Sequence, residues 1–382
     1  MSLQKPVLTR RQWLQQAGST AALTSSTLWA QPSKPPSSSN SLVVAQLVDF
    51  SQAQQDVSKD FLIGSRAAWQ DINLRGGING RIVRHVVIET DGTPSGLLAA
   101  FESVKTNPAC VVMSGSVGDQ LATQIVERSR QDSFNMAHVA PWLQNSSIEV
   151  DDQTFPIFAA RQEQITYALK TLAVMGMKEL GAVYGSARDH AAYHVDVERI
   201  ASSMKLRLAS FHTVGELRVL GQQLTPKTPA VLLFIGGTPE LAQFTQGLEK
   251  QARQRYVVAL ADVNLATLAQ MGAARATPVI ATQPVPLVNA NLGIVRRYRE
   301  TLARLFDEPP TPVSLAGFIA ARYTYEVLSG VDGVVTRHNA LAAFQKRSVL
   351  DMGGFRVSFN ADRRSNHYVT QSMMSADGRL IG

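Results

Sequence analysis

Residues 71–81, DINLRGGINGR, place three glycines among charged side chains. Glycine-rich loops cradle phosphate when they follow a strand and open a helix, so that the anion meets the helix N-terminus. Here the order is reversed, because helical spacing of apolar residues in 61–74 precedes the glycines and a strand-like run, 82–89, follows them. Gly76 or Gly77 suits the left-handed end of a helix, and the Asn-Gly pair after them is a turn dipeptide. The stretch therefore predicts a helix end and a turn.

A second loop of small residues, SGSVG at 114–118, follows the apolar run ACVVM and opens a helix-like stretch. Small residues let the backbone approach a ligand, and free N–H groups at a helix start favour an anion. Ser116 adds a hydroxyl that can donate or accept, so it is a candidate ligand-binding residue; the alternative is a plain N-cap. The motif is not G-x-S-x-G, and Cys110 lies inside the apolar run, so no catalytic nucleophile is indicated.

The charge balance argues against nucleic acid as a partner. The 382 residues carry a formal net charge of +7, and 45% of them are apolar, as in an ordinary globular chain. Three basic residues and no acidic one fall within residues 1–30, which leaves 34 basic against 30 acidic residues in the rest of the chain. The remaining basic residues are scattered, and no nucleic-acid-binding signature occurs. A single cysteine excludes an intrachain disulfide.

The N-terminal residues have the pattern of an export signal. Arg10-Arg11 is followed by a weakly apolar, Ala/Thr/Ser-rich run that ends at Ala30, and this resembles the twin-arginine signal. An amphipathic helix is the alternative. Residues 31–41 are rich in Pro and Ser and predict a disordered tether. No later run has 18 apolar residues, so we expect a periplasmic location without membrane insertion after processing.

The body of the chain alternates strand-like and helix-like stretches. Strands alternating with helices predict parallel sheets covered on both faces, and two such runs predict two α/β lobes. Three helices and a closing β pair, residues 355–359 with 368–373, are expected after residue 290. The expected strands are 42–47, 82–89, 109–113, 136–139, 180–184, 230–235 and 256–260; the expected helices are 61–74, 97–104, 118–129, 162–175, 193–204, 239–253, 265–271, 290–306, 312–328 and 339–345.

The order of these motifs resembles the leucine/isoleucine/valine-type periplasmic solute-binding proteins of branched-chain amino-acid ABC importers. The similarity starts in residues 64–91, around DINLRGGINGR and the strand after it. It continues through VVMSGSVG, LLFIGGTPELAQF and SLAGFIAARYTYEVL to the closing segment DMGGFRVSFNADRRSNHYVTQ, residues 351–371. The resemblance covers residues 42–382.

The resemblance implies a type I periplasmic binding protein: two doubly wound parallel-sheet lobes joined by a three-strand hinge. Lobe 1 would comprise residues 42–156 and 282–352, and lobe 2 residues 157–281 and 353–382. The implied function is to capture a small carboxylate-bearing solute, such as an amino acid, for a membrane permease. A ligand sensor of the same fold, or a binding protein for an aromatic or aliphatic acid, is the alternative. No enzymatic activity, cofactor or metal is predicted.

The resemblance also points to loops that follow strands. Ser116 matches a serine that binds the ligand carboxylate, and Asp262 matches an acidic residue that pairs with the ligand ammonium; the alternative for Asp262 is a helix cap. Trp142 and Gln144 stand where the family has small residues and a threonine. An aromatic wall at Trp142 suits a larger ligand, and packing against the hinge is its alternative.

Three further loops complete the predicted site. Asp189 and His190 lie near the position of a family tyrosine, and Thr238 replaces a family aromatic residue. Phe50, in the first loop, is a candidate contact. His190 and His194 have the four-residue spacing of some zinc sites, but two histidines alone are weak evidence for a metal.

Overall fold

The first described strand, β1 (Ser41–Asp49), is buried at every residue after Ser41. A strand covered on both faces is expected to be a continuous apolar run, as LVVAQL at residues 42–47 is. The predicted export signal and residues 31–40 of the predicted tether lie outside the residues that the structure describes, whereas Ser41, the last residue of that tether, begins β1. The structure is a computed structural model and describes residues 41–212, 215–249, 251–274, 276–365, 368–374 and 380–381.

The sheet of the first lobe has five parallel strands. The strand order reverses beside β1, because the chain first adds a strand on one side of β1 and then returns to add the others on its opposite side. Ligands of such sheets bind at this reversal, outside the carboxyl ends of the strands. In spatial order the strands are β2 (Ile82–Thr90), β1, β3 (Cys110–Ser114), β4 (Ala137–Val139) and β5 (Thr154–Phe155).

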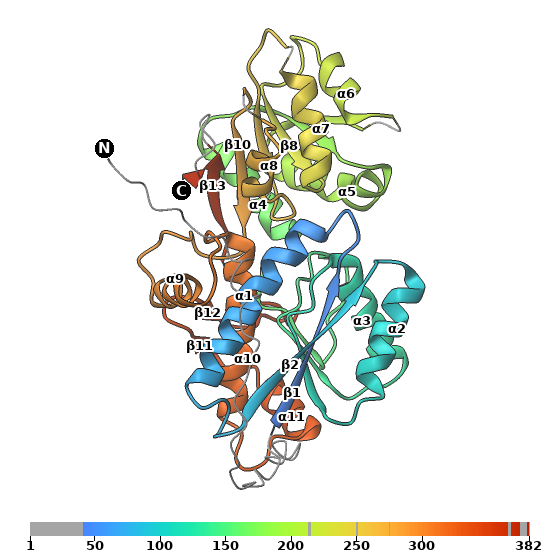
Figure 1. Ribbon diagram of the computed structural model, residues 1–382. Helices are drawn as coiled ribbons and strands as arrows, with labels where there is room; N and C mark the ends of the chain where they lie inside the picture. Colours follow the sequence, from blue (N-terminus) through green and yellow to red (C-terminus); the bar gives the residue numbers. More distant parts are fainter. Residues whose placement is uncertain are drawn as a thin grey trace, which may run out of the picture. The chain divides into compact units, whose positions relative to one another are not determined.

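Two layers of helices cover this sheet, and alternate residues of β1 divide between them. Val44 belongs to the core on one face and Ala45 to the core on the other. Three helices from the end of the chain join the first layer, so this part of the chain packs on the lobe that its N-terminal half builds. The first layer is α1 (Gln55–Leu74), α9 (Gly293–Leu305), α10 (Pro312–Ser329) and α11 (Arg337–Gln345), and the second is α2 (Pro94–Lys105) and α3 (Asp119–Gln131) (Figure 1).

The sheet of the second lobe repeats the same order. Five of its strands are parallel, and the order reverses beside the first strand of the lobe, Glu179–Tyr184. Two further strands extend one edge, each antiparallel to the strand before it. In spatial order the strands are β7 (Arg207–Phe211), β6 (Glu179–Tyr184), β8 (Val231–Ile235), β9 (Tyr256–Ala259), β10 (Val279–Gln283), β13 (Thr370–Met374) and β14 (Leu380–Ile381).

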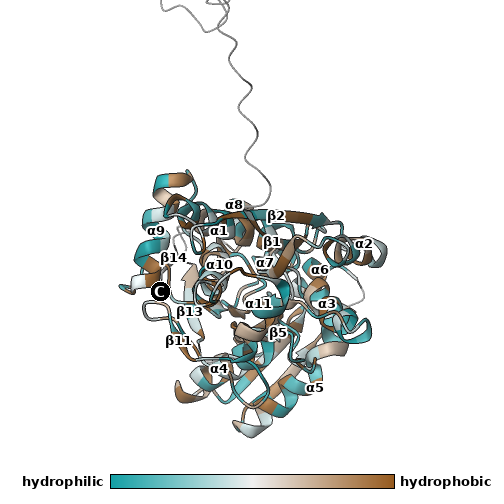
Figure 2. Ribbon diagram, turned by 90° about the horizontal axis from the view of Figure 1, so that it is seen from below, coloured by the Kyte–Doolittle hydropathy of each residue, from teal (hydrophilic) through white to brown (hydrophobic). Residues whose placement is uncertain are grey.

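Helices cover both faces of the second sheet as well. Surface helices such as α9 combine hydrophilic and hydrophobic residues, which is the pattern of a helix with one buried face (Figure 2). On one face lie α4 (Arg161–Val174) and α5 (Ala187–Ser203), and on the other α6 (Leu217–Gln223), α7 (Thr238–Leu248) and α8 (Leu265–Gln270). The predicted fold class, two doubly wound α/β lobes, is confirmed. None of the described helices is both long and apolar enough to cross a bilayer.

The predicted closing β pair is wrong. Its first member overlaps β12 (Arg356–Val357), which pairs with β11 (Leu350–Asp351). Its second member is β13, which pairs antiparallel with β10 in the second sheet, where the edge of β10 offers a longer ladder of backbone partners. The division of the chain into lobes at residues 156/157, 281/282 and 352/353 stays a prediction.

The glycine-rich stretch has the structure that its sequence predicted. Helix α1 ends at Leu74, and the Gly77 N–H donates to the Ile72 carbonyl at 2.9 Å. Gly76 and Gly77 have φ angles of 100° and 71°, a left-handed conformation that glycine adopts without strain. The stretch therefore ends α1 and turns the chain into β2, and it does not line the cavity described below.

Buried His138 makes the stability of the first lobe sensitive to acid. The residue lies in β4 and is 1% exposed, and burial lowers its pKa to about 3. The folded state thus keeps the ring neutral while the unfolded chain binds a proton below about pH 6.5, so stability is lost as the pH falls from about 6.5 towards 3. Between pH 7 and pH 5 this loss amounts to about 2 kcal/mol. We expect His138→Phe to reduce the difference in unfolding free energy between the two pH values by about that amount, measured by urea denaturation.

The same substitution at the exposed His338 serves as the control for the acid effect. If His138→Phe and the parent protein lose equal stability between pH 7 and pH 5, His138 is not the group responsible.

Candidate functional site

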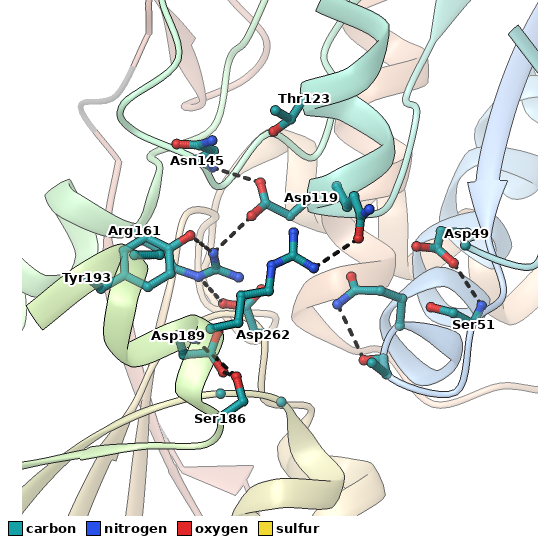
Figure 3. Close-up of a pocket in the computed structure, with 18 of the residues that line it drawn as sticks. Asp49, Ser51, Asp119, Thr123, Asn145, Arg161, Ser186, Asp189, Tyr193 and Asp262 are labelled. Carbon is teal, nitrogen blue, oxygen red and sulfur yellow. Dashed lines mark hydrogen bonds and ion pairs between the residues drawn. The ribbon is translucent and has the colours of Figure 1, made fainter. Parts of the chain in front are cut away.

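A cavity of about 730 Å³ lies where loops after the strands of both sheets meet (Figure 3). From the first lobe, Asp49 comes from the end of β1 and Asp119 from the start of α3. From the second lobe, Ser186 follows β6 and Gly236 follows β8, while Asp262 follows β9. Both reversals of strand order therefore contribute to one cavity, as expected for doubly wound sheets.

Arg161 joins two carboxylates at one end of this cavity. Its Nε donates to Asp262 Oδ2 at 2.8 Å, and its Nη1 donates to Asp119 Oδ2 at 2.9 Å and to the Tyr193 hydroxyl. The guanidinium also lies over the Tyr193 ring, 4.8 Å from its centroid. Burial disfavours the charge, but the carboxylates of Asp262 and Asp119 outweigh this effect and raise the pKa of Arg161. The arginine thus stays charged although it is only 8% exposed.

The local fold explains why Arg161 lies there. It begins α4, directly after the crossing from the first lobe, and its N–H donates to the Gln144 carbonyl at 3.0 Å. Asp119 is fixed in turn, because its Oδ1 accepts the N–H groups of Gln144 and Asn145 at 2.9 and 2.8 Å. Asp119 belongs to α3 of the first lobe and Asp262 to the loop after β9 of the second, so the ion pairs of Arg161 connect the two lobes.

A second group of carboxylates lies on the second-lobe side of the cavity. Ser186 Oγ donates to Asp189 Oδ2 at 2.6 Å and caps α5 by accepting the Asp189 N–H. Burial raises the pKa of Asp189, and burial followed by the nearby charge of Asp189 raises the pKa of Glu240. A Cβ on Gly237 would lie 2.9 Å from Glu240 Oε2, so glycine at this position leaves room for the carboxylate.

Other polar contacts also join the lobes. Thr238 Oγ1 donates to Asp56 Oδ2 at 2.6 Å, and Asn264 Nδ2 donates to Asp60 Oδ2 at 2.9 Å. Within the lining of the cavity, Arg188 Nη1 donates to Gln120 Oε1 at 3.0 Å. Burial raises the pKa of both Asp56 and Asp60. In the described arrangement the lobes are therefore held together by hydrogen bonds both inside the cavity and beyond its lining.

Two of the predicted site residues, Asp189 and Asp262, line the cavity. Asp262 does not cap α8, since Asn264 Oδ1 accepts the N–H groups of Ala266 and Thr267. The resemblance implies that the Asp262 carboxylate pairs with a ligand ammonium. In the structure one of its oxygens is already paired with the guanidinium of Arg161.

Two predicted residues, Ser116 and Trp142, lie behind the cavity wall. Ser116 is fully buried, and its carbonyl accepts the Trp142 N–H at 2.8 Å; the N-cap of α3 is Gly118, so Ser116 does not cap the helix. Trp142 packs between Phe61 and Phe158, with ring centroids 5.8 and 5.6 Å apart, and is 1% exposed. These contacts favour the alternative interpretation of Trp142, in which the indole packs in the core near the hinge.

Gln144, Thr238, His190 and Phe50 also lie outside the cavity lining. Gln144 Oε1 accepts from Gln164 Nε2 at 2.7 Å, and Thr238 makes the contact between lobes described above. His190, in α5, stacks on His194 and His212, with ring centroids 4.5 and 4.0 Å away. Phe50 packs against the core of the first lobe. The described residues include no trio of His, Cys, Asp or Glu arranged to hold a metal ion.

The prediction missed Arg161, Asp119 and Glu240, although each carried a signal. Asp119 directly follows the small-residue loop at 114–118, and Arg161 lies a few residues after residue 156, the predicted end of the first segment of lobe 1. Glu240 lies three residues after Gly237, in the first turn of α7. A search for charged residues in the first turn after each loop would have found all three.

The comparisons with known proteins agree with this architecture. The family model described as periplasmic binding protein matches residues 41–379. No curated protein matches the sequence. The chain resembles a crystal structure of an extracellular ligand-binding receptor from Verminephrobacter eiseniae, with a TM-score of 0.79, 18% identity, and coverage of 90% of this chain and 100% of the other.

Two other similar structures differ in their ligands. A branched-chain amino-acid ABC transporter protein from Thermus thermophilus with bound valine has a TM-score of 0.76 and 12% identity, covering 89% of this chain and 94% of the other. A fatty-acid ABC transporter substrate-binding protein from Thermomonospora curvata has a TM-score of 0.77 and 13% identity, covering 90% and 91%. These similarities establish the type I periplasmic binding fold, and they leave the ligand to be inferred from the cavity.

Proposed function

The chain belongs to the periplasmic binding protein family, and we propose that it is the substrate-binding component of an ABC importer, capturing a small amino compound between its lobes. The single observation that carries this proposal is the cavity of about 730 Å³ whose walls come from both lobes. Its size is that of a small-molecule site. Export to the periplasm by the twin-arginine route, delivery to a membrane permease and the absence of catalysis are parts of the same proposal.

The walls of the cavity favour a ligand with an amino group. Asp189 and Asp262 line it, and carboxylates form strong, charge-assisted hydrogen bonds with ammonium groups. The position of Ser116 does not support a role in binding a ligand carboxylate. The proposal therefore relies first on recognition of the ligand's amino group. An amino acid or a related compound is the leading class, and the similar structure with bound valine supports it.

Binding and closure are linked in this proposal. A ligand that touches both walls stabilises the arrangement in which the walls face each other, by as much as its affinities for the open and closed states differ. The hydrogen bonds from Thr238 to Asp56 and from Asn264 to Asp60 join residues of different lobes, so they also stabilise the closed arrangement.

We expect Asp262→Asn to weaken binding of the preferred amino compound at least about 10-fold, because a hydrogen bond to a charged group becomes a neutral one. The measurement is isothermal titration calorimetry of residues 31–382 against the proteinogenic amino acids and simple amines. Glu102→Gln, the same chemical change on the outer helix α2, is the matched control. Undiminished affinity in Asp262→Asn removes that carboxylate from the site, and no binding by any compound removes the premise of capture.

A further inference from the structure

The charge of the cavity wall is strongly one-sided. The wall contains six carboxylates and two guanidinium groups, which gives a formal charge of −4. Such a wall lowers the energy of a cation inside it and raises that of an anion, and the effect is larger in a partly buried site than in water. The carboxylates are those of Asp49, Asp119, Glu127, Asp189, Glu240 and Asp262, and the guanidinium groups those of Arg161 and Arg188.

The two arginines do not balance this charge. Arg161 is shared between Asp119 and Asp262, so these three side chains together keep a formal charge of −1. Arg188 reaches across the cavity to Gln120 Oε1, and its single charge offsets one of the four remaining carboxylates. The surplus therefore persists after every ion pair of the lining has been counted.

Two carboxylate oxygens of the wall still need a donor. Asp262 Oδ1 and Glu240 Oε2 are both buried and have no hydrogen-bond partner within bonding distance among the residues that the structure describes. The backbone N–H groups of Gly237 and Glu240 lie close enough to the Glu240 carboxylate to oppose the rise in its pKa, but they bring no positive charge. Asp262 is only 5% exposed, so water does not readily donate a hydrogen bond to its second carboxylate oxygen. A buried acceptor without a donor is costly, whereas an ammonium group brings three donors and a charge.

We propose that the ligand of this cavity carries a net positive charge and belongs to the basic amino acids or diamines. The inference rests on the proposed function and narrows its substrate class. One amino group would be bound beside Asp262, which follows β9, and a second beside Asp189 and Glu240, which lie in the first turns of α5 and α7. A neutral amino acid brings one cation and one anion, so it leaves the second carboxylate group without a partner.

The test compares compounds of similar length that differ in charge. L-lysine and L-norleucine share a six-carbon skeleton, but only lysine has the terminal ammonium; cadaverine has two ammonium groups and no carboxylate, and glutarate has two carboxylates. We expect calorimetry to show L-lysine or cadaverine binding at least about 10-fold tighter than L-norleucine, because a charged hydrogen bond is gained. We expect glutarate not to bind.

Variants assign the effect to named side chains. Glu240→Gln and Asp189→Asn keep the size of each side chain and remove its charge, and the amide oxygen of the latter can still accept from Ser186 Oγ. Each should weaken binding of the cationic compound about 10-fold, while Glu102→Gln should leave it unchanged. Circular dichroism verifies that each variant is folded at the temperature of the titration.

The outcomes separate this inference from the function on which it rests. If L-norleucine or glutarate binds as tightly as L-lysine and cadaverine, the protein captures a solute but the charge inference is wrong. The same holds if Glu240→Gln and Asp189→Asn both bind the cationic compound as the parent does. If no compound binds, including the proteinogenic amino acids, the charge inference and the proposed function fail together.

Discussion

We expect the Arg161→Met protein to unfold with a free energy about 3 kcal/mol lower than that of the parent. Arg161 is 8% exposed and neutralises Asp262, which is 5% exposed, at a distance of 2.8 Å. Its removal leaves that carboxylate buried without a counter-charge, which is far costlier than deleting a whole ion pair. Asp119 loses its partner as well, but it is more exposed and contributes less. The measurement is urea denaturation followed by far-ultraviolet circular dichroism.

A second substitution shows whether the uncompensated charge is the cause. The double variant Arg161→Met with Asp262→Asn lacks the buried charge, so it should recover at least about 1 kcal/mol relative to Arg161→Met alone. If Arg161→Met is destabilised only because the packing of the arginine side chain is lost, the double variant should show no such recovery. A loss below about 0.5 kcal/mol in the single variant would show that Arg161 does not stabilise the fold through these contacts.

The second large effect is expected at Trp142. Replacement by alanine should lower the free energy of unfolding by about 4 kcal/mol, because the fully buried indole contacts Phe61 and Phe158 and leaves a cavity when it is removed. Trp142→Phe retains most of these contacts and should lose less than half as much. Urea denaturation of both proteins measures the difference.

The control for Trp142 is Val174→Ala, since Val174 is 81% exposed at the end of α4 and should change stability by less than about 0.5 kcal/mol. Near-parent stability of Trp142→Ala would contradict the assignment of Trp142 to the core and restore its candidacy as a ligand contact.

The elements that the sequence predicted best are those with strong patterns. β1 and β8 are continuous apolar runs buried on both faces, and α10 is an uninterrupted helical stretch between Pro312 and Ser329. β7 was missed because it is an edge strand with half-exposed residues, so RLASF has no continuous apolar run. The pairing of β13 with β10 depends on contacts between residues about ninety positions apart, which local patterns do not encode.

The site was predicted less well for a related reason. The sequence identified the loops after the strands, and two residues from those loops, Asp189 and Asp262, do line the cavity. It did not distinguish residues that face the cavity from those that face the core, as with Ser116 and Trp142, because that choice depends on how the loop turns. The ion pairs of Arg161 join positions 119, 161 and 262 and become visible only when both lobes are present.

The central claim is that a ligand held by both walls brings the lobes together. Fluorescent labels at Ser95→Cys on α2 and Val195→Cys on α5 lie on outward positions of different lobes, and the native Cys110 is buried and unreactive by comparison. Energy transfer between the labels is measured without ligand and with saturating L-lysine, or with whichever compound of the series binds tightest. Capture between the lobes predicts a shorter mean distance between the labels when the ligand is bound. An unchanged distance in a protein that calorimetry shows to be saturated would contradict it.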